Sequence, residues 1–185
     1  MIFPIHIIGT PVLRKVAKDI DEDYPDLDVF IENMWNTMYR TDGIGLAAPQ
    51  VGKSIRLFVI DGNPLKDDYP ELEGFKKCFI NAHITEEGKD KWSFNEGCLS
   101  IPEIREDVTR PKKIKMEYYD ENWEFHQDIF EGGQARIMLH EYDHLDGILF
   151  TDKISPIRRR LIKNKLSQIS KGKISINYKH VLAKK

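Results

Sequence analysis

Two histidines and a glutamate stand close together in the sequence HEYDH at residues 140–144, where they could bind a metal ion. On an α-helix, positions four apart differ by about 40° in azimuth and about 6 Å in rise, so His140 and His144 would point from one face. The Glu141 carboxylate would lie beside the metal, where it could take a proton from metal-bound water. A catalytic site of this kind needs a third ligand, and a helix can also carry two histidines without any chemical role.

The residues around this pattern favour a helix. Ile137, Met138 and Leu139 lead into it with apolar side chains, and Gly147 is a suitable stop. The Gly-Gly pair at 132–133 follows a polar turn and marks the expected start. We therefore predict that the two histidines lie on a helix between these two glycine positions.

Candidates for the third ligand are the other histidines, the two cysteines and the many carboxylates. The other histidines lie in ordinary strand or terminal contexts, where histidine is more often a surface or core residue: His6, His83, His126 and His180. Cys98 differs, because it lies between Gly97 and Leu99 in NEGCLSIP, an irregular segment in which glycine permits close backbone approach. Cys78 lies within a strand pattern and is better explained as a small hydrophobic residue. A lone buried cysteine is a weak signal, so residue types alone leave the third ligand open.

The length of 185 residues suggests one domain, large enough to bury its own core. Hydrophobic residues make up 41% and charged residues 31%, which is typical of a soluble folded protein and excludes a disordered chain. The two cysteines form no disulfide framework and favour a reducing compartment, so we expect a cytoplasmic protein. The N-terminal sequence MIFPIHII has no basic region and no cleavage-like site after it, and no apolar run reaches membrane-spanning length.

Hydrophobic periodicity predicts the other elements. A first amphipathic helix is expected at 25–43, where five apolar residues have helical spacing: Leu27, Phe30, Ile31, Met34 and Met38. Strands are expected at 55–60, 78–84, 113–120 and 124–130, with a hairpin turn at DENW between the last two. These elements predict an α+β fold, in which mixed or antiparallel sheets pack around the central metal-binding helix and a further helix lies near the C-terminus.

The C-terminal part of the chain is strongly basic. Residues 153–185 hold 11 of the 28 lysines and arginines and no acidic residue. A helix is expected here with four apolar side chains near one face: Ile157, Leu161, Leu166 and Ile169. Residues 174–178 alternate and are expected to form a short strand. The positive charge fits either a solvated tail or a docking surface for an anionic partner such as RNA.

Three segments occur along the chain in this order: GIGLAAPQ at 43–50, EGCLS at 96–100 and HEYDH at 140–144. Together they resemble the three motifs of the peptide deformylase family. The resemblance implies one catalytic domain over 1–170 and a basic tail over 171–185. It also implies the reaction, which is hydrolysis of the formyl group from N-formylmethionine at the start of nascent polypeptides, with release of formate.

The resemblance implies a role for each matching residue. The metal ligands would be Cys98, His140 and His144, with a fourth position left open. Glu141 would act as general base and then as general acid, and Gln50 with the backbone N–H of Leu99 would form the oxyanion hole. The residues expected to contact the substrate are Ile44, Gly45, Glu96 and Ile137. Arg136 departs from the family, which usually has an apolar residue there.

The same resemblance implies one divalent metal ion, ferrous iron, which zinc, nickel or cobalt can replace. The implied partners are N-formylmethionyl nascent peptides and the ribosome, which the basic C-terminal segment would contact, and no membrane. Two alternatives remain. A metalloendopeptidase shares H-E-x-x-H, but its third ligand usually lies downstream of the helix, where only Asp152 and His180 are available. A non-catalytic RNA-binding module would use the basic segment but leaves Glu141 and Gln50 unexplained.

Overall fold

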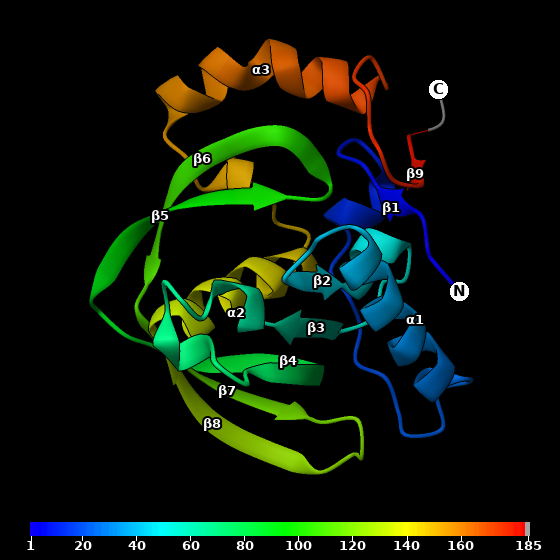
Figure 1. Cartoon of the computed structure of the whole chain (residues 1–185), viewed down its shortest axis with the longest axis vertical. Helices are drawn as coiled ribbons and strands as arrows, with labels where there is room; N and C mark the ends of the chain where they lie inside the picture. Colours follow the sequence, from blue (N-terminus) through cyan, green and yellow to red (C-terminus); the bar gives the residue numbers. More distant parts are fainter. Residues whose placement is uncertain (184–185) are drawn as a thin grey trace.

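The computed structural model describes residues 1–183, whose arrangement is shown in Figure 1. The helices are α1 (Leu27–Arg40), α2 (Gly132–Leu145) and α3 (Pro156–Ser170). The strands are β1 (Ile5–His6), β2 (Gly45–Ala47), β3 (Leu57–Asp61), β4 (Lys76–Glu87), β5 (Lys91–Cys98), β6 (Ile101–Pro111), β7 (Lys113–Tyr119), β8 (Phe125–Glu131) and β9 (His180–Val181). Short 3-10 turns occur at Pro11–Arg14, Ala48–Val51, Asn63–Leu65, Pro70–Leu72 and Phe150–Asp152.

A five-stranded antiparallel sheet forms one side of the molecule, with strand order β2-β3-β4-β7-β8. Its register pairs Val59 of β3 with Cys78 of β4, and Ile114 of β7 with Phe130 of β8. The Val, Ile and Phe side chains on these strands suit a half-buried pleated surface. All four predicted strands are confirmed, although β4 is longer than predicted at both ends.

Helix α2 lies at the centre of the molecule, between the five-stranded sheet and the β5–β6 hairpin (Figure 1). Ten of its 14 residues are buried, and Met138 and Leu145 on it are fully enclosed by the apolar core. A helix enclosed on most sides holds its side chains in fixed positions, because close packing leaves no room for other rotamers. The helix begins at Gly132 and ends before Gly147, as predicted, so the expected α+β fold around a central helix is confirmed.

The β5–β6 hairpin covers the face of α2 opposite the sheet, and the sequence prediction missed both of its strands. Every second residue faces inward, but on β6 the inward residues include Glu106 and Arg110, which are buried despite their charge. These charges hide the alternation of apolar and polar residues on which strand prediction depends. Cys98 is therefore the last residue of a strand and not part of an irregular segment, although the pairing shifts register between Gly97 and Cys98.

Helix α1 follows its prediction closely. It spans 27–40, and all five predicted apolar positions are buried in the core. The chain then passes through Gly43 into β2, the edge strand of the sheet, which contacts α2. The segment 43–50 therefore lies beside the helix that carries the two histidines.

Helix α3 lies on the outside of the molecule, against β6 (Figure 1). Leu166 and Ile169 pack on the core, as predicted. Ile157 and Leu161 are 74% and 67% exposed, so the predicted apolar face is wrong for the first half of the helix. In that half Arg158 turns toward the domain and pairs with a buried glutamate of β6, which leaves the apolar side chains outside.

The segment after α3 folds back along the N-terminal strand. Residues 174–178 form no strand, so that prediction is wrong, and the pairing lies further on, where β9 runs parallel to β1. The predicted basic tail extends to residues 184–185, which lie outside the described residues. Over residues 1–183, no helix combines the length and the apolar character needed to cross a membrane.

Candidate metal centre and its pocket

Three potential metal ligands converge where α2 meets the end of β5. His140 and His144 project from one face of α2, with ring centroids 5.3 Å apart. The Cys98 Sγ lies 3.3 Å from the Nε2 of His144. One ligand atom from each of the three side chains lies within 4.8 Å of the other two. The structure thus brings together the two helix histidines and the cysteine singled out in the sequence.

The spacing and donor chemistry of these side chains fit a tetrahedral metal ion. Metal–sulfur and metal–nitrogen bonds of zinc-site length, held at a tetrahedral angle, separate sulfur from nitrogen by roughly 3.6 Å, close to the observed contact. His140 Nδ1 lies 2.9 Å from Glu96 Oε2, which leaves Nε2 for a metal, as is usual for ligating histidines. Burial lowers the pKa of His144 well below its usual value, so its ring is neutral and able to ligate. A thiolate with two imidazoles accepts zinc, iron, cobalt or nickel.

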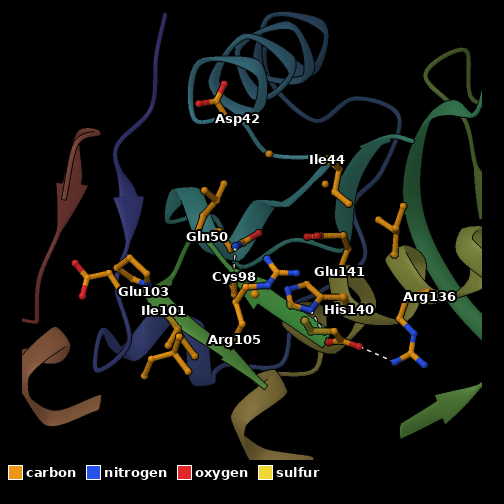
Figure 2. A pocket seen from close by; sticks show the side chains of 18 of the residues that line it. Asp42, Ile44, Gln50, Cys98, Ile101, Glu103, Arg105, Arg136, His140 and Glu141 are labelled. Carbon is orange, nitrogen blue, oxygen red and sulfur yellow. Dashed lines mark hydrogen bonds and ion pairs between the residues drawn. The ribbon is translucent and has the colours of Figure 1, made fainter. Parts of the chain in front are cut away.

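Glu141 points from α2 toward the chain near Ile44 (Figure 2). Its carboxyl is buried, and Oε2 has no hydrogen-bond partner among residues 1–183. Burial raises the pKa of Glu141 to about 7. A Cβ atom on Gly45 would lie only 2.5 Å from Glu141 Oε1, so a glycine is required there to leave room for the carboxyl. A carboxyl with a free oxygen and this pKa can accept and return a proton near neutral pH.

The side-chain amide of Gln50 faces the same centre (Figure 2). Its Oε1 accepts a hydrogen bond of 2.9 Å from the backbone N–H of Ala47, which fixes the orientation of the amide. The Nε2 donor therefore points the other way, 3.5 Å from Cys98 Sγ and 3.3 Å from Ser100 Oγ. Gln50 is only 2% exposed, so this donor is held in place by its surroundings.

These groups open into a pocket of about 440 Å³. Nine of the ten predicted site residues line it: Ile44, Gly45, Gln50, Glu96, Cys98, Leu99, Ile137, His140 and Glu141. The tenth, His144, is buried. The pocket therefore combines apolar walls with a small set of polar groups gathered near the ligand cluster, which is the usual character of a small-molecule or peptide site.

Comparison with known proteins identifies the family. A family model described as polypeptide deformylase matches residues 2–160. The chain belongs to this family. It is 56% identical to the peptide deformylase of Christiangramia forsetii, over 97% of this chain and 95% of that protein. It is 51% identical to the peptide deformylase of Flavobacterium johnsoniae, with the same two coverages.

Solved structures of the polypeptide deformylase family have the same fold. A crystal structure of the peptide deformylase from Thermotoga maritima matches with a TM-score of 0.76 and 41% identity, over 84% of this chain and 99% of that one. The Arabidopsis thaliana peptide deformylase 1B in complex with an inhibitor matches with a TM-score of 0.82 and 34% identity, over 92% of each chain. The comparisons confirm the predicted fold and the predicted deformylase activity, and they exclude the metalloendopeptidase alternative.

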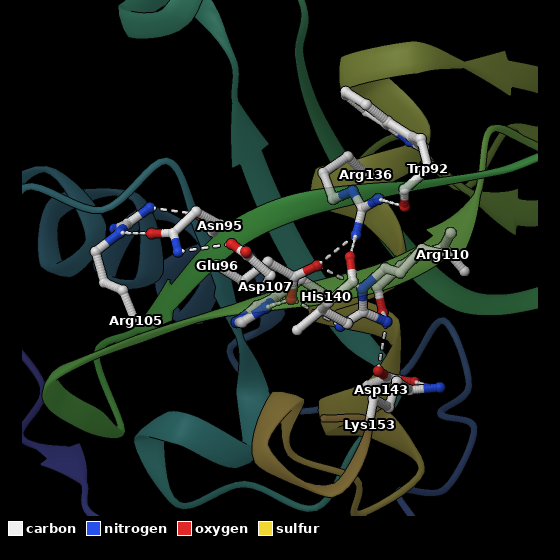
Figure 3. A network of polar contacts seen from close by, with 12 residues as sticks. Trp92, Asn95, Glu96, Arg105, Asp107, Arg110, Arg136, His140, Asp143 and Lys153 are labelled. Carbon is white, nitrogen blue, oxygen red and sulfur yellow. Dashed lines mark hydrogen bonds and ion pairs between the residues drawn. The ribbon is translucent and has the colours of Figure 1, made fainter. Parts of the chain in front are cut away.

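In this deformylase, a buried network of charges surrounds Glu96 (Figure 3). Arg110 donates to both Glu96 oxygens at 2.7 and 2.9 Å, and Arg136 donates to Oε1 at 2.7 Å. Burial alone would raise the pKa of Glu96, but Arg110 and His140 hold it well below its usual range. Both oxygens are thus engaged by neighbouring side chains, which differs from the predicted contact with substrate. Arg110 also donates to Asp143 Oδ2 at 2.6 Å, so its guanidinium joins a carboxylate of β5 to a carboxylate of α2.

The sequence analysis did not predict the roles of two residues in the site. Arg136, an arginine within an apolar helix segment, lies with its guanidinium 4.9 Å from the centre of the Trp92 ring and donates to the Trp92 carbonyl at 2.7 Å. Only its unusual residue type hinted at this role. Tyr178 lines the pocket from beyond α3, where the alternation over 174–178 predicted only a strand and no motif pointed to the site.

A second group of possible ligands lies in the β7–β8 turn, where Asp120, Glu124 and His126 meet. The Asp120 Oδ1 accepts hydrogen bonds from the backbone N–H groups of Asn122 and Glu124 at 2.8 and 3.0 Å. Its Oδ2 lies 2.9 Å from His126 Nε2. These are the bonds of an aspartate that stabilises a turn, so we assign the group a structural role.

The charge network leads to a prediction about stability. Arg110→Met is expected to lower the free energy of unfolding by about 3–5 kcal/mol, because Glu96 and Asp143 would stay buried without their shared cation. The matched control is Lys113→Met, which breaks an exposed ion pair with Glu131 and should cost less than about 1 kcal/mol. Urea unfolding at equal metal loading measures both values. If both variants lost less than about 1 kcal/mol of unfolding free energy, the charge network around Arg110 would not stabilise the fold as proposed.

Proposed function

We propose that this chain removes the formyl group from N-formylmethionine at the start of nascent polypeptides, an N-terminal processing step of protein biosynthesis in the cytoplasm. One observation carries the proposal: the buried Glu141 carboxyl, with its free Oε2, shares a pocket with a Cys/His/His ligand set and the Gln50 amide. Membership of the polypeptide deformylase family and the names of the relatives support the same reaction.

The proposed metal ligands are Cys98, His140 and His144. A divalent metal held by them would supply a Lewis acid that lowers the pKa of water and polarises the formyl carbonyl. The resemblance to the family favours ferrous iron, and the mixed sulfur and nitrogen donors also suit zinc, nickel or cobalt. Glu96 orients one of these ligands, because its carboxylate accepts a hydrogen bond from His140 Nδ1 and so fixes the direction of the His140 ring.

Glu141 handles the proton in the proposed reaction. Its Oε2 accepts the proton that the attacking water loses and later gives it to the nitrogen that leaves as the free amine. Gln50 Nε2 and the Leu99 N–H donate hydrogen bonds to the formyl oxygen as it becomes negative. The Ala47 N–H donates to Gln50 Oε1 and so fixes the side-chain amide. The Gln50 Nε2 donor therefore needs no reorientation during the reaction.

The peptide is proposed to lie along Ile44 and Gly45. Strand β2, which begins at Gly45, is the edge strand of the sheet, so an extended peptide can pair with the free side of this segment. Ile137 offers an apolar wall for the methionine side chain. Glu96 is not part of this surface in our proposal, because its two oxygens are engaged by the arginines and by His140.

The test of this function is hydrolysis of formyl-Met-Ala-Ser by anaerobically purified protein, with metal analysis of the same sample. We expect release of formate by protein that contains one metal ion per chain, with higher activity for iron than for zinc. Casein serves as the control substrate and should stay intact. Cleavage of casein without release of formate would contradict the proposal.

We also propose that residues 1–170 form the catalytic domain and that the basic C-terminal segment docks on ribosomal RNA. Five exposed cations on α3 support this docking: Arg158, Arg159, Arg160, Lys163 and Lys165. Three of them pair with acidic residues of the domain, namely Arg158, Arg159 and Lys165. Among residues 1–183, Arg160 and Lys163 form no ion pair, and the exposed Ile157 and Leu161 lie on the same helix.

The docking proposal predicts the effect of charge reversal. The double variant Arg160→Glu/Lys163→Glu is expected to co-sediment with ribosomes about tenfold less at low salt, because phosphate contacts by cations dominate such binding. Hydrolysis of formyl-Met-Ala-Ser should stay unchanged, since neither residue lines the pocket. The matched control is Lys89→Glu/Lys91→Glu, which makes the same charge change outside α3. Equal sedimentation of the two double variants would rule out α3 as the docking element.

A further inference from the structure

Tyr178 connects the segment after α3 to the catalytic pocket. Its hydroxyl donates a hydrogen bond of 2.6 Å to the backbone carbonyl of Leu99, and its side chain lines the pocket together with Leu99. Burial, followed by the nearby charge of Cys98, raises the pKa of Tyr178 to about 12, so the hydroxyl stays protonated and remains a donor. The residue lies beyond the family match, which ends at 160.

The bond from Tyr178 acts on the turn that joins β5 to β6. This turn is also held by the backbone N–H of Ile8, which donates to the Ser100 carbonyl at 2.9 Å. On its inner side the Ser100 hydroxyl accepts from Gln50 Nε2 at 3.3 Å. Three segments distant in sequence therefore fix the two residues that follow Cys98. The Leu99 N–H and the Leu99 carbonyl belong to neighbouring peptide planes that meet at one Cα, where only φ and ψ can turn. The bond from Tyr178 limits ψ at Leu99, and together with the bonds to Ser100 it restrains the turn in which the N–H lies.

The segment that carries Tyr178 is itself anchored. The next carbonyl, of Lys179, accepts from the Ile5 N–H at 2.8 Å, and the Val181 carbonyl accepts from the Ile7 N–H at 3.0 Å. Gly172, with a φ of +67°, lets the chain turn back after α3, and a Cβ there would lie 2.4 Å from a Leu182 methyl carbon. Figure 1 shows β9 beside β1 as a result. The phenol is thus held by a short parallel ladder and not by a loose tail.

We propose that Tyr178 is a positioning residue for deformylation, which sets the direction of the Leu99 N–H through its bond to the Leu99 carbonyl. This rests on the proposed function, in which that N–H stabilises the developing oxyanion. Such a donor acts only when it is aimed in advance at the place where charge develops. The C-terminal segment therefore completes the oxyanion hole from outside the three sequence motifs.

Tyr178→Phe tests this inference, because it removes the hydroxyl and keeps the ring. The matched control is Tyr118→Phe, since the Tyr118 hydroxyl donates to Asp128 at 2.8 Å in the β7–β8 hairpin and does not line the pocket. We expect kcat for formyl-Met-Ala-Ser to fall about tenfold in Tyr178→Phe, a part of the effect of a whole oxyanion donor. KM should stay within about twofold, because substrate binding is not the step affected. The metal content of both variants should equal that of the parent chain.

A second measurement follows the Leu99 N–H directly. Hydrogen exchange of this amide in the zinc-loaded protein should become about tenfold faster in Tyr178→Phe and stay unchanged in Tyr118→Phe. Unchanged exchange, unchanged kcat, or an equal loss of kcat in both variants would each overturn the role of Tyr178. If the parent chain hydrolyses no formyl peptide, the proposed function fails, and the exchange measurement still decides whether Tyr178 restrains Leu99.

Discussion

Glu141→Ala is expected to lower kcat/KM for formyl-Met-Ala-Ser by between about 10²- and 10⁴-fold, the range typical of a lost general acid–base group. The physical reason is that, among residues 1–183, this carboxyl alone offers a buried oxygen without a hydrogen-bond partner beside the ligand cluster. The ligand set Cys98, His140 and His144 stays complete, so the variant should bind metal as well as the parent chain. Steady-state kinetics and elemental analysis of the same samples measure the two effects separately.

Glu141→Gln provides the matched control for shape. Glutamine fills the same space beside Gly45 but cannot accept the proton. The loss of activity in Glu141→Gln should therefore equal the loss in Glu141→Ala. Because the carboxyl is buried and Oε2 has no hydrogen-bond partner within residues 1–183, its replacement by a neutral amide should leave the melting temperature unchanged or raise it. Near-normal turnover by either metal-loaded variant would contradict the assignment of Glu141 as the proton carrier.

The parts of the fold that the sequence predicted correctly are those whose local pattern agrees with their environment. Helix α1 buries one apolar face, so its periodicity marked the five core positions without error. Helix α2 was placed by its glycines and by the apolar run before His140. The three motifs marked eight of the predicted pocket residues, because each motif is a short segment whose residues meet the centre directly, and Ile137 lies one helical turn before the third motif.

The parts that the sequence did not predict depend on partners far away in the chain. Arg110 looks like a surface residue until Glu96 and Asp143, from β5 and α2, meet it in the interior. The exposure of Ile157 follows from the pairing of Arg158 with Glu106, 52 residues away. No local pattern carries such pairings, which form only when tertiary contacts bring the charges together.

Cys98→Ser is expected to weaken metal binding by about 100-fold or more, because the loss of a partner that merely orients a ligand already costs 10- to 100-fold. A hydroxyl is a poor replacement for a thiolate at a soft site. The remaining histidines are fixed by α2 and by the bond from Glu96 to His140, so the pocket itself should persist. Metal content after dialysis, and hydrolysis of formyl-Met-Ala-Ser with and without added metal, measure the effect.

Cys78→Ser is the matched control, since it makes the same chemical change at the other cysteine. Cys78 is buried on β4 within the apolar core, where burial raises the pKa of its thiol, so it does not supply a thiolate. This variant should keep its metal and its kcat, while the buried hydroxyl lowers the free energy of unfolding by about 1–3 kcal/mol. The two serine variants therefore separate the loss of a ligand from the loss of stability. Metal retained by Cys98→Ser and lost by Cys78→Ser would show that the ligand set is wrong.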